Sequence, residues 1–233
     1  MDAVSRSSIR ATPMITVWDP IVRTGHWALV AAFAVAYLSA EEETGSPDAL
    51  HVWGGYVVGA IVILRVVWGF VGSRYARFSD FVCGPITSLR YLVDMIAGRT
   101  RRYVGHSPAG GAMVIALLAC LAGTVATGVI AYGEGGKGPL ASNGATVVNA
   151  PNAAESATER GAAETEGSEG GRSAVGELHG ALANITLALV ILHIVGVGVA
   201  SVAHNENLIA AMLNGKKRAE DPPEGQHGPM RNS

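Results

Sequence analysis

Four long stretches of the chain are almost free of charged side chains. They cover about residues 22–41, 51–72, 109–132 and 177–203, and a helix needs about 20 mostly apolar residues to cross a bilayer. Away from the ends of these stretches, Arg65 is the only charged residue. The first stretch is short, but it lacks a small-residue cleavage site, so we interpret it as a retained span. The pattern predicts an all-α, integral-membrane four-helix bundle.

Composition agrees with this prediction. The chain has 233 residues, of which 49% are hydrophobic and 15% are charged, whereas a soluble domain carries about a quarter charged residues. The net charge of -2 gives no basis for nucleic-acid binding. The two cysteines, Cys83 and Cys120, are far apart and no CxxCH occurs, which excludes covalent c-type haem attachment.

The distribution of basic residues predicts the orientation. Residues 1–25 hold three Lys or Arg, residues 73–108 hold six, and the tail from 204 holds four, whereas the connections 41–50 and 133–177 hold none and three. Basic connections stay on the cytoplasmic side. We therefore expect a bacterial inner-membrane protein with both termini in the cytoplasm.

Three segments outside the spans have a distinct composition. Residues 133–175 are rich in Ala, Gly, Glu, Ser and Thr, which predicts a flexible periplasmic loop, although a docking surface for a basic periplasmic protein stays open. Residues 219–233 are expected to form a disordered cytoplasmic tail. The apolar spacing of Pro85 to Ala97 predicts an amphipathic helix in the cytoplasmic interface.

Four of the seven histidines lie at or inside the ends of predicted spans, where a polar side chain is costly and usually marks function. His179 and His193 are 14 residues apart, so they share one helix face and stand about 21 Å apart along the axis. The predicted orientation puts His26 at the level of His193 near the inner surface. It puts His51 at the level of His179 near the outer surface.

Each level then holds two imidazoles from different helices. We call His26 and His193 the inner pair, and His51 and His179 the outer pair. Two facing imidazoles are the axial ligands of a bis-histidine haem iron, and helix bundles build such sites in their interior. The spacing therefore predicts two b haems enclosed by the bundle, with these four histidines as the iron ligands.

Two arginines are expected to bind the cofactor as well. Arg65 lies 14 residues after His51 and so near the inner level, where a buried guanidinium would need an anion such as a haem propionate. The alternative is an arginine that reaches to the inner membrane surface. Arg23 is assigned the same cofactor-binding role. His106 packs in a loop or serves quinone or proton chemistry at the inner level, and no catalytic residue is assigned.

Several motifs together resemble the bacterial cytochrome b-561 family, which overlaps the b-type cytochrome subunits of nickel–iron hydrogenases, thiosulfate reductases and formate dehydrogenases. The resemblance covers roughly residues 15–132 and 176–218. It implies a four-helix, di-haem b cytochrome that exchanges electrons with the quinone pool, and its axial ligands correspond to His26, His51, His179 and His193. The residues that carry it are WDPIVRTGHW, HVWGGY at 51–56, RVVWGFVGSRYARFSDF at 65–81, GHSPAG at 105–110, ELHG at 177–180, LHIVGV at 192–197 and ENLIAAMLNGKKR at 206–218.

The predicted function is transmembrane electron transfer between quinone and a periplasmic partner, either a c-type cytochrome or an oxidoreductase subunit. An alternative is a dedicated membrane anchor and cytochrome b subunit of a hydrogenase- or reductase-type complex. From a different class, a membrane metal-ion transporter would use the histidines at one site near the midplane. Lipid surrounds the protein in each case, and a homodimer stays open.

Overall fold

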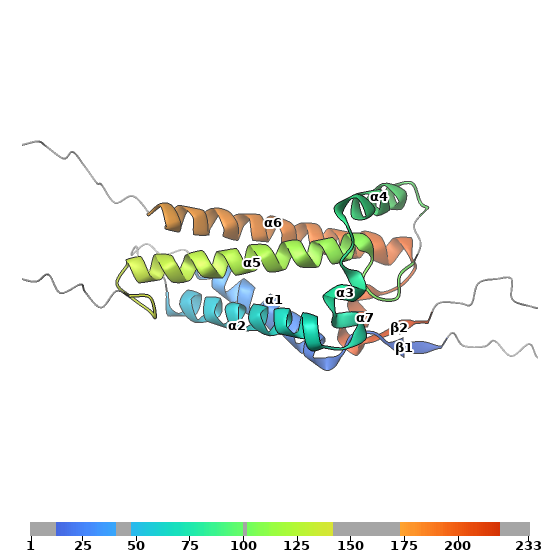
Figure 1. The fold of residues 1–233 in the computed structure, drawn as a ribbon, viewed down its shortest axis with the longest axis horizontal. Coiled ribbons are helices and arrows are strands. Elements are labelled where there is room, and N and C mark those ends of the chain that lie inside the picture. The colour runs from blue at the N-terminus through green and yellow to red at the C-terminus, as the bar shows by residue number, and fades with distance from the viewer. Residues whose placement is uncertain (1–12, 41–47, 100–101, 142–172, 220–233) are drawn as a thin grey trace, which may run out of the picture.

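Four long helices run side by side along the long axis of the molecule (Figure 1). The computed structural model describes residues 13–40, 48–99, 102–141 and 173–219. All four helices are long and apolar enough to cross a membrane, which confirms the predicted all-α membrane bundle. No helix end differs from its predicted span by more than three residues. The helices are α1 (Pro20–Leu38), α2 (Ala49–Val71), α5 (Pro108–Glu134) and α6 (Ala174–Ala203).

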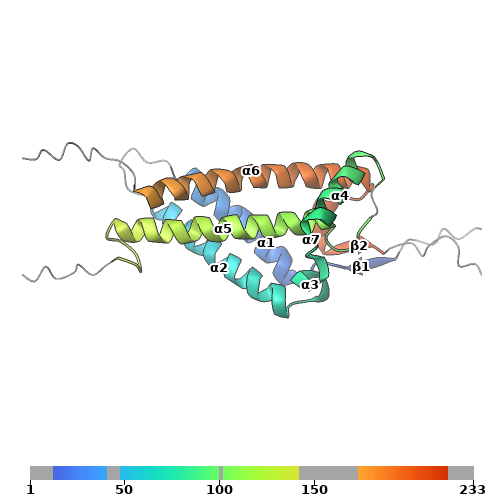
Figure 2. The same cartoon turned by 45° about the horizontal axis from the view of Figure 1, so that its top comes forward.

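The helices pack as a chain of neighbours, α1 on α2, α2 on α5 and α5 on α6 (Figure 2). No contact of similar extent joins α1 to α6 within the described residues. A small apolar core lies at mid-length, where Val58, Val62 and Leu121 are buried. Leu29 and Phe33 from α1 pack against it. The middle of the bundle is thus closed by aliphatic side chains.

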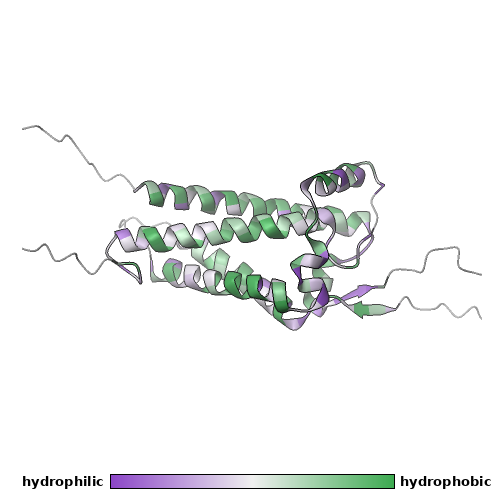
Figure 3. Cartoon of the chain, viewed as in Figure 1, coloured by the Kyte–Doolittle hydropathy of each residue, from purple (hydrophilic) through white to green (hydrophobic). Residues whose placement is uncertain are grey.

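Most large apolar side chains of the spans face outward. Ile63, Leu192 and Ile194 are all more than half exposed, and Figure 3 shows hydrophobic residues along the whole length of the four helices. A soluble protein rarely exposes such an area, whereas lipid is the solvent that suits it. The exposed apolar faces are therefore the lipid-facing surface of a membrane protein.

Three of the four spans begin at a capping side chain. In each case the cap accepts a hydrogen bond from a backbone N–H of the first turn, which would otherwise lack a partner. Proline follows two of these caps at the first helical position, where its missing N–H costs nothing. The caps are Asp19, Ser107 and Ser173, and the prolines are Pro20 and Pro108.

Short elements close one end of the bundle. They are η1 (Arg74–Ala76), α3 (Phe78–Phe81), α4 (Pro85–Ile96), α7 (Leu208–Asn214), β1 (Met14–Thr16) and β2 (Lys216–Arg218). The helix expected at Pro85 to Ala97 is α4. The two strands were not expected; they pair antiparallel, with Ile15 opposite Lys217. Glu206 ties this end together through ion pairs with Arg102 at 2.9 Å and Lys217 at 3.4 Å.

Two expectations concern segments that the structure describes only in part. The predicted periplasmic loop 133–175 falls mainly on residues 142–172, and the predicted tail 219–233 falls mainly on residues 220–233. Both of these ranges lie outside the described residues. The expectations for them stay predictions.

Candidate functional site

The four histidines of the spans meet as two pairs, and all four are half-buried. The ring centres of His26 and His193 are 6.4 Å apart. Those of His51 and His179 are 5.9 Å apart. Both pairs join the α1–α2 side of the bundle to α6, and the rise of α6 separates them by about 21 Å. The structure thus brings together the side chains that the sequence placed at equal depth.

In the outer pair, both rings are held by backbone carbonyl groups. His51 Nδ1 donates to the carbonyl oxygen of Ala36 on α1 at 2.8 Å. His179 Nδ1 donates to the carbonyl oxygen of Thr124 on α5 at 2.9 Å. Because a carbonyl oxygen can only accept, Nδ1 carries the proton in both rings. Each Nε2 is then left with its lone pair available to a metal ion.

Close helix contacts make these two hydrogen bonds feasible. A Cβ atom on Gly128 would lie 2.8 Å from Cε1 of His179, so only glycine lets the imidazole lie against α5 at this point. A Cβ atom on Gly54 would lie 3.0 Å from the Cβ atom of Ala36. That contact brings α1 close enough for the Ala36 carbonyl to reach His51.

The inner pair has no comparable support. His26 Nδ1 is buried and has no hydrogen-bond partner in the described part of the chain, and the ring stands edge-on to Trp27 at 5.3 Å. No hydrogen bond fixes the His193 ring among the described residues either. The two pairs therefore differ in how their rings are oriented.

The two arginines assigned to the cofactor lie at the end of the bundle that carries α4. Arg65 donates from Nη1 to the carbonyl oxygen of Ala76 at 3.1 Å, and its guanidinium lies 5.5 Å from the ring centre of Phe78. Arg23 donates from Nη2 to the carbonyl oxygen of Leu213, while its Nε is buried without a partner. Both side chains thus brace the closed end. Their contact with a cofactor stays a prediction.

His106 is enclosed at the same end of the bundle. Its ring centre lies 4.4 Å from that of Phe81 and 4.6 Å from that of Trp18, and its Nδ1 has no partner among the described residues. Burial, followed by the charges of Arg65 and Lys217 and by His193, lowers the pKa of His106 to about 3. The ring is neutral at physiological pH.

Asp19 joins the start of α1 to the end of α2. Its carboxylate accepts hydrogen bonds from Trp68 Nε1 at 3.0 Å, from the Ser73 hydroxyl at 2.5 Å and from Val22 N at 2.9 Å. Burial raises the pKa of Asp19, but these three hydrogen bonds and one from the backbone N–H of Ile21 outweigh it and leave the pKa below the usual value. This carboxylate therefore anchors the inner level of both helices.

The sequence did not predict several of these contacts. The Asp-Pro dipeptide at 19–20 is a capping signal that was available. The carbonyl groups of Ala36 and Thr124 leave no signal, because every residue has one. Gly128 is one of several glycines in the predicted spans, and nothing in the sequence distinguishes it from a glycine of ordinary helix packing.

The geometry suits a metal held by two axial imidazoles. Two nitrogens at about 2 Å from one metal, each about 1 Å from its ring centre, put the ring centres roughly 6 Å apart, as in both pairs. No group of three or more His, Cys, Asp or Glu that could hold a metal ion occurs in the described ranges. A macrocycle that supplies the equatorial nitrogens fits two such ligands, whereas a free metal ion needs more of them.

Comparison with known proteins gives one match. The model of a family described as prokaryotic cytochrome b561 matches residues 17–215. This range contains all four spans and both histidine pairs. No curated protein and no solved structure matches the chain.

Proposed function

Because the chain belongs to the prokaryotic cytochrome b561 family, it is a membrane b-type cytochrome of electron transfer, and we propose that it holds two haems b. His26 and His193 ligate the inner haem, and His51 and His179 ligate the outer haem. The observation that carries this proposal is the pairing of imidazoles from different helices at 6.4 Å and 5.9 Å.

A haem bound between each pair supplies reversible one-electron chemistry at its iron. The residues of the chain orient the ligands and set the surroundings. The carbonyl groups of Ala36 and Thr124 hold the outer imidazoles in the tautomer that leaves Nε2 free. The core of Val58, Val62 and Leu121 keeps water out of the space between the two levels.

The inner end differs in charge from the rest of the bundle. Arg65 lies inside the bilayer span, and Arg23 lies near the start of α1. Both have N–H groups left over for the propionates of the inner haem. We propose that the quinone binds at this inner end, by analogy with the family. His106 is buried there between aromatic rings and available to position it.

The charge distribution supports an inner-membrane location with both termini in the cytoplasm. Residues 13 and 219 lie at the same end of the bundle, because β1 pairs with β2. That end carries the described basic side chains of 73–99 and 102–108 and those of Lys216–Arg218, whereas Lys137 is the one basic residue described at the opposite end. The outer haem then faces the periplasm and a redox partner there, either a c-type cytochrome or an oxidoreductase subunit.

Haem content tests the proposal directly. We expect the purified chain to hold two haems b by pyridine haemochrome assay, with two irons by metal analysis. Replacing any one of the four ligands with alanine should leave one haem. The opened site should lose its haem, because one of its two imidazole ligands is gone. The haem at the other level should persist with an unchanged spectrum, because both of its ligands remain.

A matched control uses a histidine that belongs to neither pair. His204 follows α6 and contacts the Tyr91 hydroxyl at 3.3 Å. The His204→Asn variant should keep both haems. Retention of two haems in His179→Ala, or a bound metal without extractable haem in the native chain, would contradict the assignment.

A further inference from the structure

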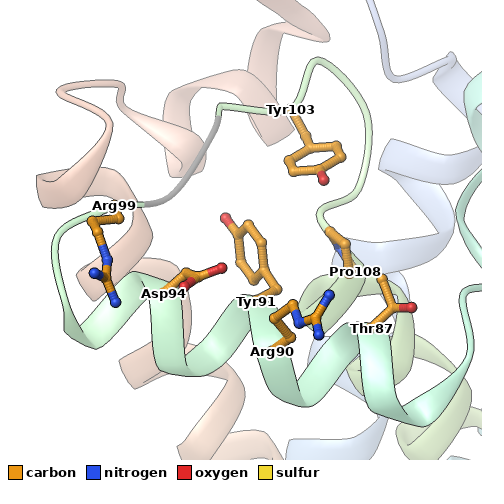
Figure 4. A pocket seen from close by; sticks show the side chains of 7 residues that line it. All are labelled: Thr87, Arg90, Tyr91, Asp94, Arg99, Tyr103 and Pro108. Atoms are coloured by element: carbon orange, nitrogen blue, oxygen red, sulfur yellow. The ribbon is translucent and has the colours of Figure 1, made fainter.

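A polar pocket lies outside the histidine pairs, between α4 and the segment that leads into α5. Figure 4 shows that its lining side chains come from both sides of this gap. The cavity measures ≈ 170 Å³, which suits a group the size of a lipid headgroup better than a single ion. The lining residues are Thr87, Arg90, Tyr91, Asp94, Arg99, Tyr103 and Pro108.

Two guanidinium groups dominate the chemistry of this pocket. The side chains of Arg90 and Arg99 are both exposed, and neither guanidinium group has a hydrogen bond or an ion pair with any described residue. Thr87 and Tyr103 add hydroxyl groups to the same lining. Figure 4 shows Arg90 and Arg99 toward opposite ends of the lining, with Tyr91 and Asp94 between them, so the two arginines are suited to a phosphate headgroup that lies between them. Asp94 also lines the pocket and can accept hydrogen bonds from hydroxyls of a headgroup.

The helix that forms one wall of the pocket presents an apolar face to the surroundings. Ile86, Leu89 and Val93 are spaced by three and four residues on α4, and they are 78%, 63% and 55% exposed. A helix with such a face and polar residues on the other lies in the membrane interface, with its apolar side chains in the acyl region. Phosphate groups of lipids stand at the level of its polar side.

We propose that this pocket, which we call the α4 pocket, binds the headgroup of an anionic glycerophospholipid. Arg90 and Arg99 bind the phosphate, Asp94 accepts from headgroup hydroxyls, and the acyl chains lie along Ile86, Leu89 and Val93. The proposal is independent of the haem assignment, because it uses no residue of either histidine pair.

Lipid binding to the full-length, haem-loaded protein tests the α4 pocket. Native mass spectrometry would compare phosphatidylglycerol with phosphatidylcholine of the same acyl chains. One arginine in contact with the headgroup changes binding to anionic lipid about fivefold. We expect Arg90→Gln and Arg99→Gln each to weaken phosphatidylglycerol binding by that factor and the double variant by about 25-fold.

Arg74→Gln is the matched control, because Arg74 is exposed, belongs to the same basic end and lies outside the pocket. It should change binding by less than about twofold. An unchanged haem spectrum in every variant shows that folding is intact. Equal binding of both lipids, equal losses with Arg74→Gln, or displacement of phosphatidylglycerol by millimolar inorganic phosphate would overturn the proposal.

Discussion

The two histidine pairs sit in the same bundle but are supported in different ways. In the outer pair each ring donates to a backbone carbonyl of a neighbouring helix. In the inner pair His26 Nδ1 is buried without a partner. The outer rings are thus oriented by the contact between spans. The ring contacts of the inner pair are those of His26 with His193 and with Trp27.

Local packing explains the difference. At the outer level Gly54 and Gly128 let backbone approach backbone or ring, so the carbonyl groups lie within reach. At the inner level space is filled by side chains that arrive from outside the spans, such as Trp18 and Phe81 around His106. The outer site is therefore sensitive to small changes in the spans. The inner site is sensitive to changes in the closing elements.

The largest expected effect comes from combining histidine substitutions within or across the pairs. The double variant His51→Ala/His179→Ala should keep one haem, like either single variant, because both changes remove the same site. The double variant His51→Ala/His193→Ala should keep none, because each change opens a different site. Pyridine haemochrome assay of the purified variants measures both outcomes. The same haem content in the two double variants would mean that the pairing is wrong.

The next effect concerns Gly128 and should reach only the outer site. In Gly128→Ala the new methyl group forces the His179 ring away from α5 and lengthens its hydrogen bond to Thr124. Loss of such support costs about 10–100-fold in metal affinity. Haem transfer to an acceptor protein should speed up by that factor for the outer haem only.

Gly123→Ala is the control on the same helix. Its Cβ atom would meet Cδ1 of Leu182 at 3.3 Å, and that side chain can rotate away. Both haems should dissociate from it at the native rate. Faster loss of the inner haem in Gly128→Ala would show that the two levels are not independent.

A third effect should appear only at the inner site, on lowering the pH. The pKa of His106 is about 3 in the folded protein and about 6.5 when the ring meets water. Since only the opened state binds the proton between these values, stability falls as the pH drops below about 6.5, by up to about 1.4 kcal/mol per pH unit. The inner haem should therefore be lost first in an absorbance titration from pH 7.5 to 4.5.

His106→Phe supplies the comparison for this titration, because it keeps a ring between Trp18 and Phe81 but has no titratable group. The inner haem of this variant should survive to lower pH, while the outer haem behaves as in the native chain. Equal acid sensitivity of the inner haem in both proteins would remove His106 as the cause.

Hydrophobic patterning was enough to predict the four spans, because lipid requires long apolar helices with all backbone groups paired. It also predicted α4, since the spacing of Ile86, Leu89 and Val93 marks one helix face. The strands β1 and β2 could not be predicted. A strand of three residues is too short to show a periodic pattern of apolar residues. The pairing of the two strands also depends on how close residues 14 and 218 lie in space.

The depth of the histidines was predictable for a similar reason. Helix rise and topology fix which rings share a level, so His26 with His193 and His51 with His179 followed from counting residues. The hydrogen bonds that orient the outer rings were not predictable from the sequence. It depends on how closely two helices approach at Gly54 and Gly128, which only the packed structure reveals.

The smallest expected effect is a difference in reduction potential between the two haems. A carbonyl that accepts from Nδ1–H makes the imidazole a stronger donor and favours the ferric state, and only the outer pair has such bonds. The positive charges of Arg65 and Lys217 near the inner level favour the ferrous state there. A combined tenfold change in the one-electron equilibrium corresponds to about 59 mV. We expect the outer haem to have the lower potential by about this amount.

Redox titration of two single variants measures each potential alone. His193→Ala keeps the outer haem, and His179→Ala keeps the inner one. The opposite order would mean that neither the hydrogen bonds of the outer rings nor the positive charges near the inner level determine which haem has the lower potential.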